Sequence, residues 1–271
     1  MYDERKSGEE KSMDFPKYLY HYTNLSSLCS ILKSGMIRFN PLTKMDDMDE
    51  AEIRDFKNFA KYVFVSSWTS DSRESIPFWN MYTRDMSGIR LRLKAFPFET
   101  YEWDYSPESQ AISDLKPKYF PKELAENDRY AILPLAFNLF FLPVEYTDDE
   151  GKIYPSIQKI NGSNFTMELN EVGKYKRKEW EFQSEWRYRL VYFDAGVKEL
   201  GVDPGKALER MEKGAEPAID HVDLKLTKES LSDVEILTGP KMSSGDKELL
   251  RLLCEKYCTK ARIQESRLKI R

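Results

Sequence analysis

A histidine and a glutamate are the two side chains of this sequence best suited to chemistry. His21 lies in a predicted strand, 18–23, directly before a predicted helix, and Glu185 lies where a later predicted strand, 186–192, begins. A histidine is close to half-titrated near neutral pH, so its ring can donate to or accept from a hydroxyl. A carboxylate at a strand end beside a cleft can stabilise a developing positive charge or hold a ribose hydroxyl. The plainer alternatives are a histidine bonded to backbone and an ion pair between Glu185 and Arg187 or a nearby lysine.

Hydroxyl and phenol groups could add binding contacts. Ser66 and Ser67 end a predicted strand, 62–68, and can either orient a polar ligand or cap the following turn. Tyr82 lies in a predicted helix, 76–85, where its ring can stack on a flat ligand or fill the core. The local pattern leaves both alternatives open.

Two segments raise the question of a metal site. An acidic run could ligate Mg²⁺ through oxygen, although acids also complement the dipole of a first helical turn. Cys254 and Cys258 share one face of a predicted helix, without the further ligands that zinc needs. We therefore expect no metal, and two buried thiols in a reducing compartment. The acidic residues are Asp46, Asp47, Asp49, Glu50 and Glu52.

The composition is that of a globular protein. Of the 271 residues, 41% are hydrophobic and 32% charged, which excludes a disordered chain. The net charge of −4 argues against generic binding to a phosphate backbone, although a local basic pocket stays possible. The N-terminus is polar and charged, and the most apolar run, 131–144, is short and broken by prolines. We expect a cytoplasmic protein without a membrane span.

The elements that must position these residues form an α+β pattern. Strands are predicted over 18–23, 37–40, 62–68, 88–93, 144–146, 186–192, 222–226, 234–237 and 262–270. Helices are predicted over 25–34, 76–85, 122–142, 164–180 and 246–257, and the acidic run is expected to be a loop entering a helix. We expect a flexible tail over 1–14 and a single domain over 15–271, with mostly antiparallel sheets and peripheral helices.

Several short motifs, in the order in which they occur, resemble the uncharacterised bacterial family DUF2971. The likeness covers about residues 18–270 and implies a shared fold rather than an activity. The motifs lie at 20–23 with the helix to Gly35, at 44–50, at 66–68, at 78–82 with Gly88, and at 181–189.

The strand–helix–glycine–strand unit with a histidine in its first strand also distantly resembles the opening of the ADP-ribosyltransferases. That superfamily binds NAD in a cleft between two packed sheets. Its members place histidine or arginine on the first strand, tyrosine or serine on a second, and glutamate at the mouth of a later strand. The matching positions here are His21, Ser66 or Ser67, Tyr82 and Glu185, and Gln183 resembles a Gln-x-Glu variant.

The resemblance implies a site for NAD as substrate. His21 would bond the nicotinamide-side ribose, Tyr22 and Tyr82 would flank nicotinamide, and Ser66 would orient the ribose or a neighbouring residue. Glu185 would hold a ribose 2′-hydroxyl and stabilise the oxocarbenium ion as nicotinamide leaves. The expected catalytic residues are Glu185 and His21, and the expected NAD-binding residues are His21, Tyr22, Ser66, Ser67, Tyr82 and Arg187.

Three functions follow from these observations. The first is an NAD-consuming transferase or glycohydrolase acting in conflict with phage or competitors, with an unknown acceptor. The second is an RNA-end enzyme such as a 2′-phosphotransferase, which the basic residues Arg90, Arg92, Lys94 and 174–178 suggest. The third is a non-catalytic interaction module. We favour them in that order, with a dinucleotide as partner, nucleic acid not favoured, and no membrane.

Overall fold

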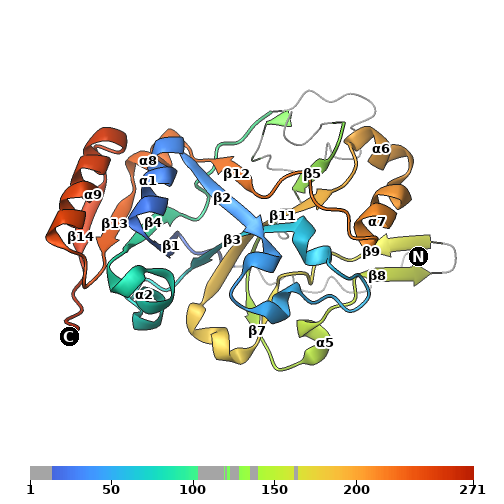
Figure 1. Ribbon diagram of the computed structural model, residues 1–271, viewed down its shortest axis with the longest axis horizontal. Coiled ribbons are helices and arrows are strands. Elements are labelled where there is room, and N and C mark those ends of the chain that lie inside the picture. Colours follow the sequence, from blue (N-terminus) through green and yellow to red (C-terminus); the bar gives the residue numbers. More distant parts are fainter. Residues whose placement is uncertain (1–13, 103–118, 120, 123–127, 135–139, 162–163) are drawn as a thin grey trace, which may run out of the picture.

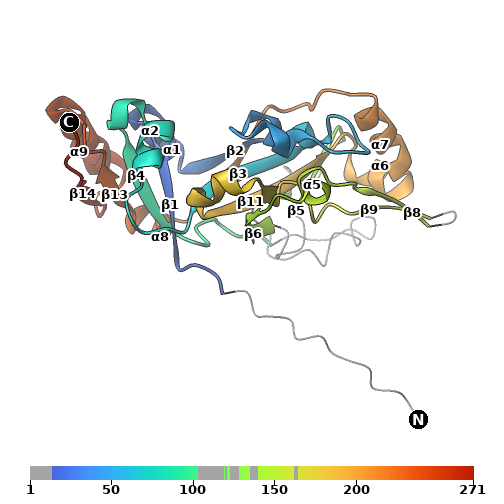
Figure 2. The same ribbon diagram turned by 90° about the horizontal axis from the view of Figure 1, so that it is seen from below.

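The chain folds around one large, mostly antiparallel sheet with helices at its ends and on one face (Figures 1 and 2). The computed structural model describes residues 14–102, 119, 121–122, 128–134, 140–161 and 164–271. The α+β class expected from the sequence is therefore observed. None of the helices in this described part has the length and apolar content needed to span a membrane.

The first three elements form as the sequence predicts, because their signals are local. They are β1 (Tyr18–Thr23), α1 (Leu25–Ser34) and β2 (Met36–Pro41). The Asn24 side chain accepts a hydrogen bond of 2.8 Å from the Ser27 amide and so caps the helix. Gly35 ends it in the left-handed region, at φ 68°, and donates its amide to the Ile31 carbonyl.

The large sheet has the order β12-β2-β3-β1-β4-β13-β14, and β11 adds a branch that also carries β5 and β6. Its β13–β14 pair is parallel, and its other pairs are antiparallel. The further strands are β3 (Val63–Thr69), β4 (Ile89–Lys94), β5 (Ala131–Pro134), β6 (Phe141–Pro143), β11 (Glu185–Phe193), β12 (Val222–Lys225), β13 (Glu235–Thr238) and β14 (Arg262–Glu265).

The remaining elements surround this sheet. Two small pairs are β7 (Glu145–Tyr146) with β10 (Tyr175–Lys176) and β8 (Gln158–Asn161) with β9 (Asn164–Met167). The α-helices are α2 (Ile76–Tyr82), α5 (Glu150–Ile153), α6 (Val197–Val202), α7 (Pro204–Glu212), α8 (Lys228–Ser232) and α9 (Ser244–Tyr257). Short 3-10 helices are η1 (Leu42–Lys44), η2 (Met48–Ala51), η3 (Phe59–Tyr62), η4 (Arg84–Met86) and η6 (Lys178–Gln183).

The sheet splits along one edge of β3. On its other edge β3 pairs with β11 from Val63 to Thr69. On the split edge β2 pairs only with Phe64 and Val65, and β1 pairs only with Thr69. Residues 66–68 therefore lie between two diverging strands, which α1 connects (Figure 1).

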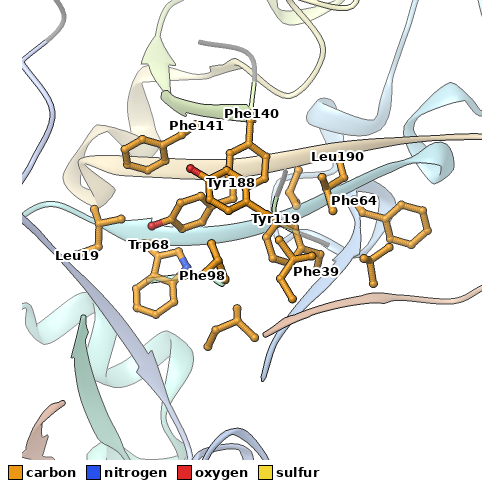
Figure 3. Packing of buried hydrophobic residues seen from close by; sticks show 14 of the residues in the cluster. Leu19, Phe39, Phe64, Trp68, Phe98, Tyr119, Phe140, Phe141, Tyr188 and Leu190 are labelled. Carbon is orange, nitrogen blue, oxygen red and sulfur yellow. The ribbon is translucent and has the colours of Figure 1, made fainter. Parts of the chain in front are cut away.

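Aromatic side chains fill the main core beneath this region (Figure 3). Tyr188 of β11 packs edge-on against Phe98 at 5.0 Å and stacks on Phe141 at 4.7 Å between ring centroids. Phe39 and Phe64 are also fully buried. Most of the driving force here is removal of apolar surface from water, and the ring geometry adds a smaller term.

One predicted helix, 164–180, is wrong, and the described part of another, 122–142, holds two strands besides the helical residues Lys122 and Phe140. The apolar stretch within 122–142 contains β5 and β6, which pair with β11, whereas 123–127 and 135–139 lie outside the described residues. The stretch 164–180 contains β9, β10 and the start of η6 instead. In a buried apolar run such as 131–143, the periodicity does not distinguish helix from strand. Pairing with the distant strand β11 determines that 131–134 and 141–143 form strands.

Other boundaries changed less. The acidic run forms the 3-10 turn η2 rather than the start of an α-helix, and the closing strand ends at Glu265 rather than Ile270. Residues 1–13 of the expected tail lie outside the described part. Cys254 and Cys258 are buried free thiols, as expected.

Candidate functional site

A cleft of about 580 Å³ opens where β1 and β2 leave β3. Side chains from α1, α2, η6 and the start of β11 complete its walls. Of the seven residues that the resemblance implied for an NAD site, six line this one cleft and Arg187 does not. The six are His21, Tyr22, Ser66, Ser67, Tyr82 and Glu185.

His21 joins the two sides of the split. Its Nδ1 lies 3.1 Å from the Ser67 carbonyl oxygen, on the edge of β3 between β1 and β2. A carbonyl can only accept, so Nδ1 carries the proton and Nε2 is the nitrogen left to accept from a ligand. Burial lowers the pKa of His21, against the smaller effect of the Ser67 hydrogen bond. The ring is therefore neutral at pH 7, tilted against Trp68 at 5.0 Å.

Ser66 and Tyr22 use part of their binding capacity in contacts within the protein. Ser66 Oγ accepts a 3.0 Å hydrogen bond from the indole of Trp68, which fixes that ring in the cleft wall. Tyr22 is 3% exposed and packs against Phe78 and Trp79, at 4.9 and 4.7 Å between ring centroids. Tyr22 therefore supports the wall through its ring packing, and less of it faces a ligand than its sequence position suggests.

Glu185 is held at the cleft by its backbone. It follows Ser184, which adopts a left-handed conformation at φ 41°, an uncommon geometry for a residue other than glycine. The Glu185 amide donates to the hydroxyl of Tyr146 at 2.9 Å. In the sheet Glu185 lies opposite Thr69, which lies opposite Tyr20, so one row crosses β11, β3 and β1.

The Glu185 carboxylate belongs to a closed ring of four buried charges. Lys176 contacts Glu185 at 2.7 Å and Glu50 at 3.2 Å. Arg187 contacts Glu185 at 2.5 Å and also pairs with Glu50. All four side chains are at most 5% exposed, and only Glu185 and Lys176 of the four line the cleft. Arg187 thus reaches the cleft only through Glu185.

This ring fixes the charge of Glu185. Burial alone would raise the pKa of its carboxyl, but the charges and hydrogen bonds of Arg187 and Lys176 outweigh that effect and lower it to about 2. Glu185 is therefore ionised across the neutral pH range, and its two ion pairs hold it in place. Buried charges of this kind carry a large desolvation cost, and they concentrate at functional sites.

A chain of hydrogen bonds runs from Glu185 through Lys176 and Gln183 to Tyr82 of α2. Lys176 donates to Gln183 Oε1 at 2.7 Å, and Gln183 Nε2 donates to the hydroxyl of Tyr82 at 2.7 Å. Burial, followed by the nearby Asp46 carboxylate, raises the pKa of Tyr82, which stays a phenol. Asp46, Tyr82, Lys176, Gln183 and Glu185 all line the cleft.

Three members of this site, Lys176, Glu50 and Asp46, were considered from the sequence only for other chemistry, nucleic-acid binding for the lysine and Mg²⁺ binding for the two acids. Lys176 sits in the basic stretch 174–178, and the two acids sit in the acidic run, so each blends into a charged neighbourhood. Glu50 and Arg187 are 137 positions apart, and the sequence gives no local sign of their pairing.

Several other charges of those two segments form ion pairs outside the ring. Arg177 binds Asp49 at 2.5 Å, and Lys174 binds Glu145 at 3.1 Å. Among the described residues, no three His, Cys, Asp or Glu side chains gather in a group that could hold a metal ion. In β4 the basic residues are likewise engaged: Arg92 pairs with Glu235, Lys94 with Glu229, and Arg90 donates to the Ser72 carbonyl.

Comparisons with family models, curated proteins and solved structures find no match for this chain. The chemistry of the cleft is therefore inferred from its own geometry. A neutral imidazole acceptor, a fixed carboxylate and an aromatic wall surround a space within the range of roughly 300–1,000 Å³ typical of sites for small molecules and cofactors.

Proposed function

We propose that the protein consumes NAD, as an ADP-ribosyltransferase or NAD glycohydrolase of the kind that the sequence resembles. The observation that carries the proposal is the shared cleft. His21 and Glu185, 164 positions apart in the chain, line one hollow together with Tyr82 and Ser66. Each offers what the reaction needs: an acceptor for a ribose hydroxyl and a fixed negative charge.

Electrostatics at one end of the cleft favour a positively charged reacting centre. Three carboxylates, Glu50, Asp46 and Glu185, stand against two cations, Lys176 and Arg187, which leaves one net negative charge in this cluster. The oxocarbenium ion that forms as nicotinamide leaves is positive, so a preorganised negative environment lowers its energy relative to the bound substrate.

The same cleft offers surfaces for the rest of the molecule. Trp68, Phe78 and Tyr82 give aromatic wall against which a flat nicotinamide ring can pack. Lys44, on the exposed part of the wall, carries the charge that a pyrophosphate attracts. The ion pairs made by the other basic residues give no comparable support to an RNA-binding face.

Nicotinamide release from NAD tests the proposal. Wild type, E185Q, H21A and a matched control, E181Q, are compared by chromatography of the products; Glu181 is exposed and lies outside the cleft lining. We expect E185Q to lower kcat by about 10²–10³-fold, as for loss of one preorganised electrostatic contact, and E181Q to match wild type. Equal activity in wild type and E185Q would remove Glu185 from the mechanism.

A further inference from the structure

Transfer of the ribosyl group from nicotinamide requires a negative charge that stabilises the ribosyl cation and a base that deprotonates the nucleophile. Glu185 can supply only the charge. Its negative charge can stabilise the ribosyl cation. The water or hydroxyl that attacks the anomeric carbon must also lose a proton to a base. Both oxygens of Glu185 are held, one by Lys176 at 2.7 Å and the other by Arg187 at 2.5 Å. A carboxylate that binds protons as weakly as this one is a poor base at neutral pH.

Among the described residues that line the cleft, the other candidates for a base are His21, Asp46 and Asp223. Asp223 is bound through both oxygens by Arg38, at 3.1 and 3.2 Å. His21 is fixed to the Ser67 carbonyl, and its remaining nitrogen faces the ribose in the proposed function. In the described part of the chain, the Asp46 carboxylate is neither bound by an arginine, as Asp223 is, nor assigned to the ribose, as His21 is.

Asp46 is also placed at the same end of the cleft as Glu185. Its side chain is exposed and lies beside the hydroxyl of Tyr82. That hydroxyl accepts from Gln183, so its own proton is free to point at the Asp46 carboxylate. Lys176 donates hydrogen bonds to both Gln183 and Glu185. Tyr82 therefore orients the Asp46 carboxylate at the end of the cleft where both oxygens of Glu185 are already held.

We propose that Asp46 is the general base that activates the attacking water or acceptor hydroxyl, a role that rests on the proposed function. In this step the oxygen of the nucleophile bonds to the anomeric carbon. The bond from that carbon to the nicotinamide nitrogen breaks, and its electron pair leaves with nicotinamide. The proton of the nucleophile goes to a carboxylate oxygen of Asp46 and then to solvent. The acceptor is accordingly a neutral O–H group, water included.

Azide separates this role from a structural one, because azide attacks without losing a proton. The variants are D46N, E185Q and the matched control E52Q, whose exposed acid lies near Asp46 in the chain but outside the cleft lining. Nicotinamide release is measured at saturating NAD with and without sodium azide, after thermal melts show that every variant is folded at the assay temperature. We expect D46N to lose about 10²–10⁴-fold in kcat. Azide restores its nicotinamide release and gives an ADP-ribosyl azide, while E52Q behaves as wild type and E185Q is not rescued.

Two results would overturn the role of Asp46. One is a D46N variant as active as wild type. The other is a slow D46N variant that azide does not accelerate, which would assign Asp46 to binding or structure. These results are distinguishable from failure of the proposed function, in which wild type itself releases no nicotinamide. In that case the proposed role of Asp46 also fails.

Discussion

Replacing Glu185 by glutamine should destabilise the fold by an amount that depends on pH. The folded carboxyl has a pKa of about 2, against the usual 4.5, because Arg187 and Lys176 outweigh its burial. At about 1.4 kcal/mol per pH unit, this difference corresponds to about 3 kcal/mol of stability at pH 7. The substitution also leaves two buried cations with only Glu50 as a partner, which acts in the same direction.

The sign of the pH dependence follows from proton binding. The unfolded chain takes up a proton at this carboxyl near pH 4.5, whereas the folded chain resists until about pH 2. The contribution is therefore complete above pH 4.5 and is lost as the pH falls towards 2. At pH 3 about half of it or less remains.

Urea denaturation at pH 7, 5, 4 and 3 measures this directly, with E181Q as the matched control. The difference in unfolding free energy between wild type and E185Q should be about 3 kcal/mol at pH 7 and shrink by about half at pH 3. A difference below about 1 kcal/mol at pH 7, or one that stays constant down to pH 3, would refute the charge ring as described.

Three further predictions concern the elements around the cleft. Arg187→Met should lower the unfolding free energy by about 3–5 kcal/mol in urea, because it leaves two buried carboxylates with one lysine; a variant as stable as wild type would contradict this. Gly88→Ala should cost about 1–3 kcal/mol in a thermal melt, since a Cβ there would lie 2.3 Å from the Thr23 carbonyl oxygen; an unchanged Tm would show that the strands tolerate it. His21 should titrate below pH 6.5 by NMR, because burial lowers its pKa, and its contribution to stability should decline as the pH falls below 6.5; titration above that value would exclude the neutral ring.

The first unit of the fold could be predicted because its determinants are neighbours in the chain. Asn24 caps α1, Gly35 ends it, and a stripe of leucines faces the core. The stretches that became β5 and β6 could not, because both are apolar runs whose conformation depends on pairing with β11.

The candidate site divides in the same way. His21 and Glu185 could be picked out because each is a reactive type at the end or start of a strand. Lys176 and Glu50 could not, since their pairing joins β10 to η2 and shows only once the chain is folded. The sequence also could not show how deeply each side chain is buried. Arg187 lies on the same face of β11 as Glu185, yet it is 0% exposed and does not line the cleft.

The most direct test of the central claim is a crystal structure of the E185Q variant with NAD. We expect the dinucleotide in the cleft between β1 and β3, with a ribose hydroxyl within hydrogen-bond distance of His21 Nε2 and the nicotinamide end beside position 185. Dinucleotide bound elsewhere on the protein, or a cleft that stays filled by its own side chains in the presence of saturating NAD, would contradict the account.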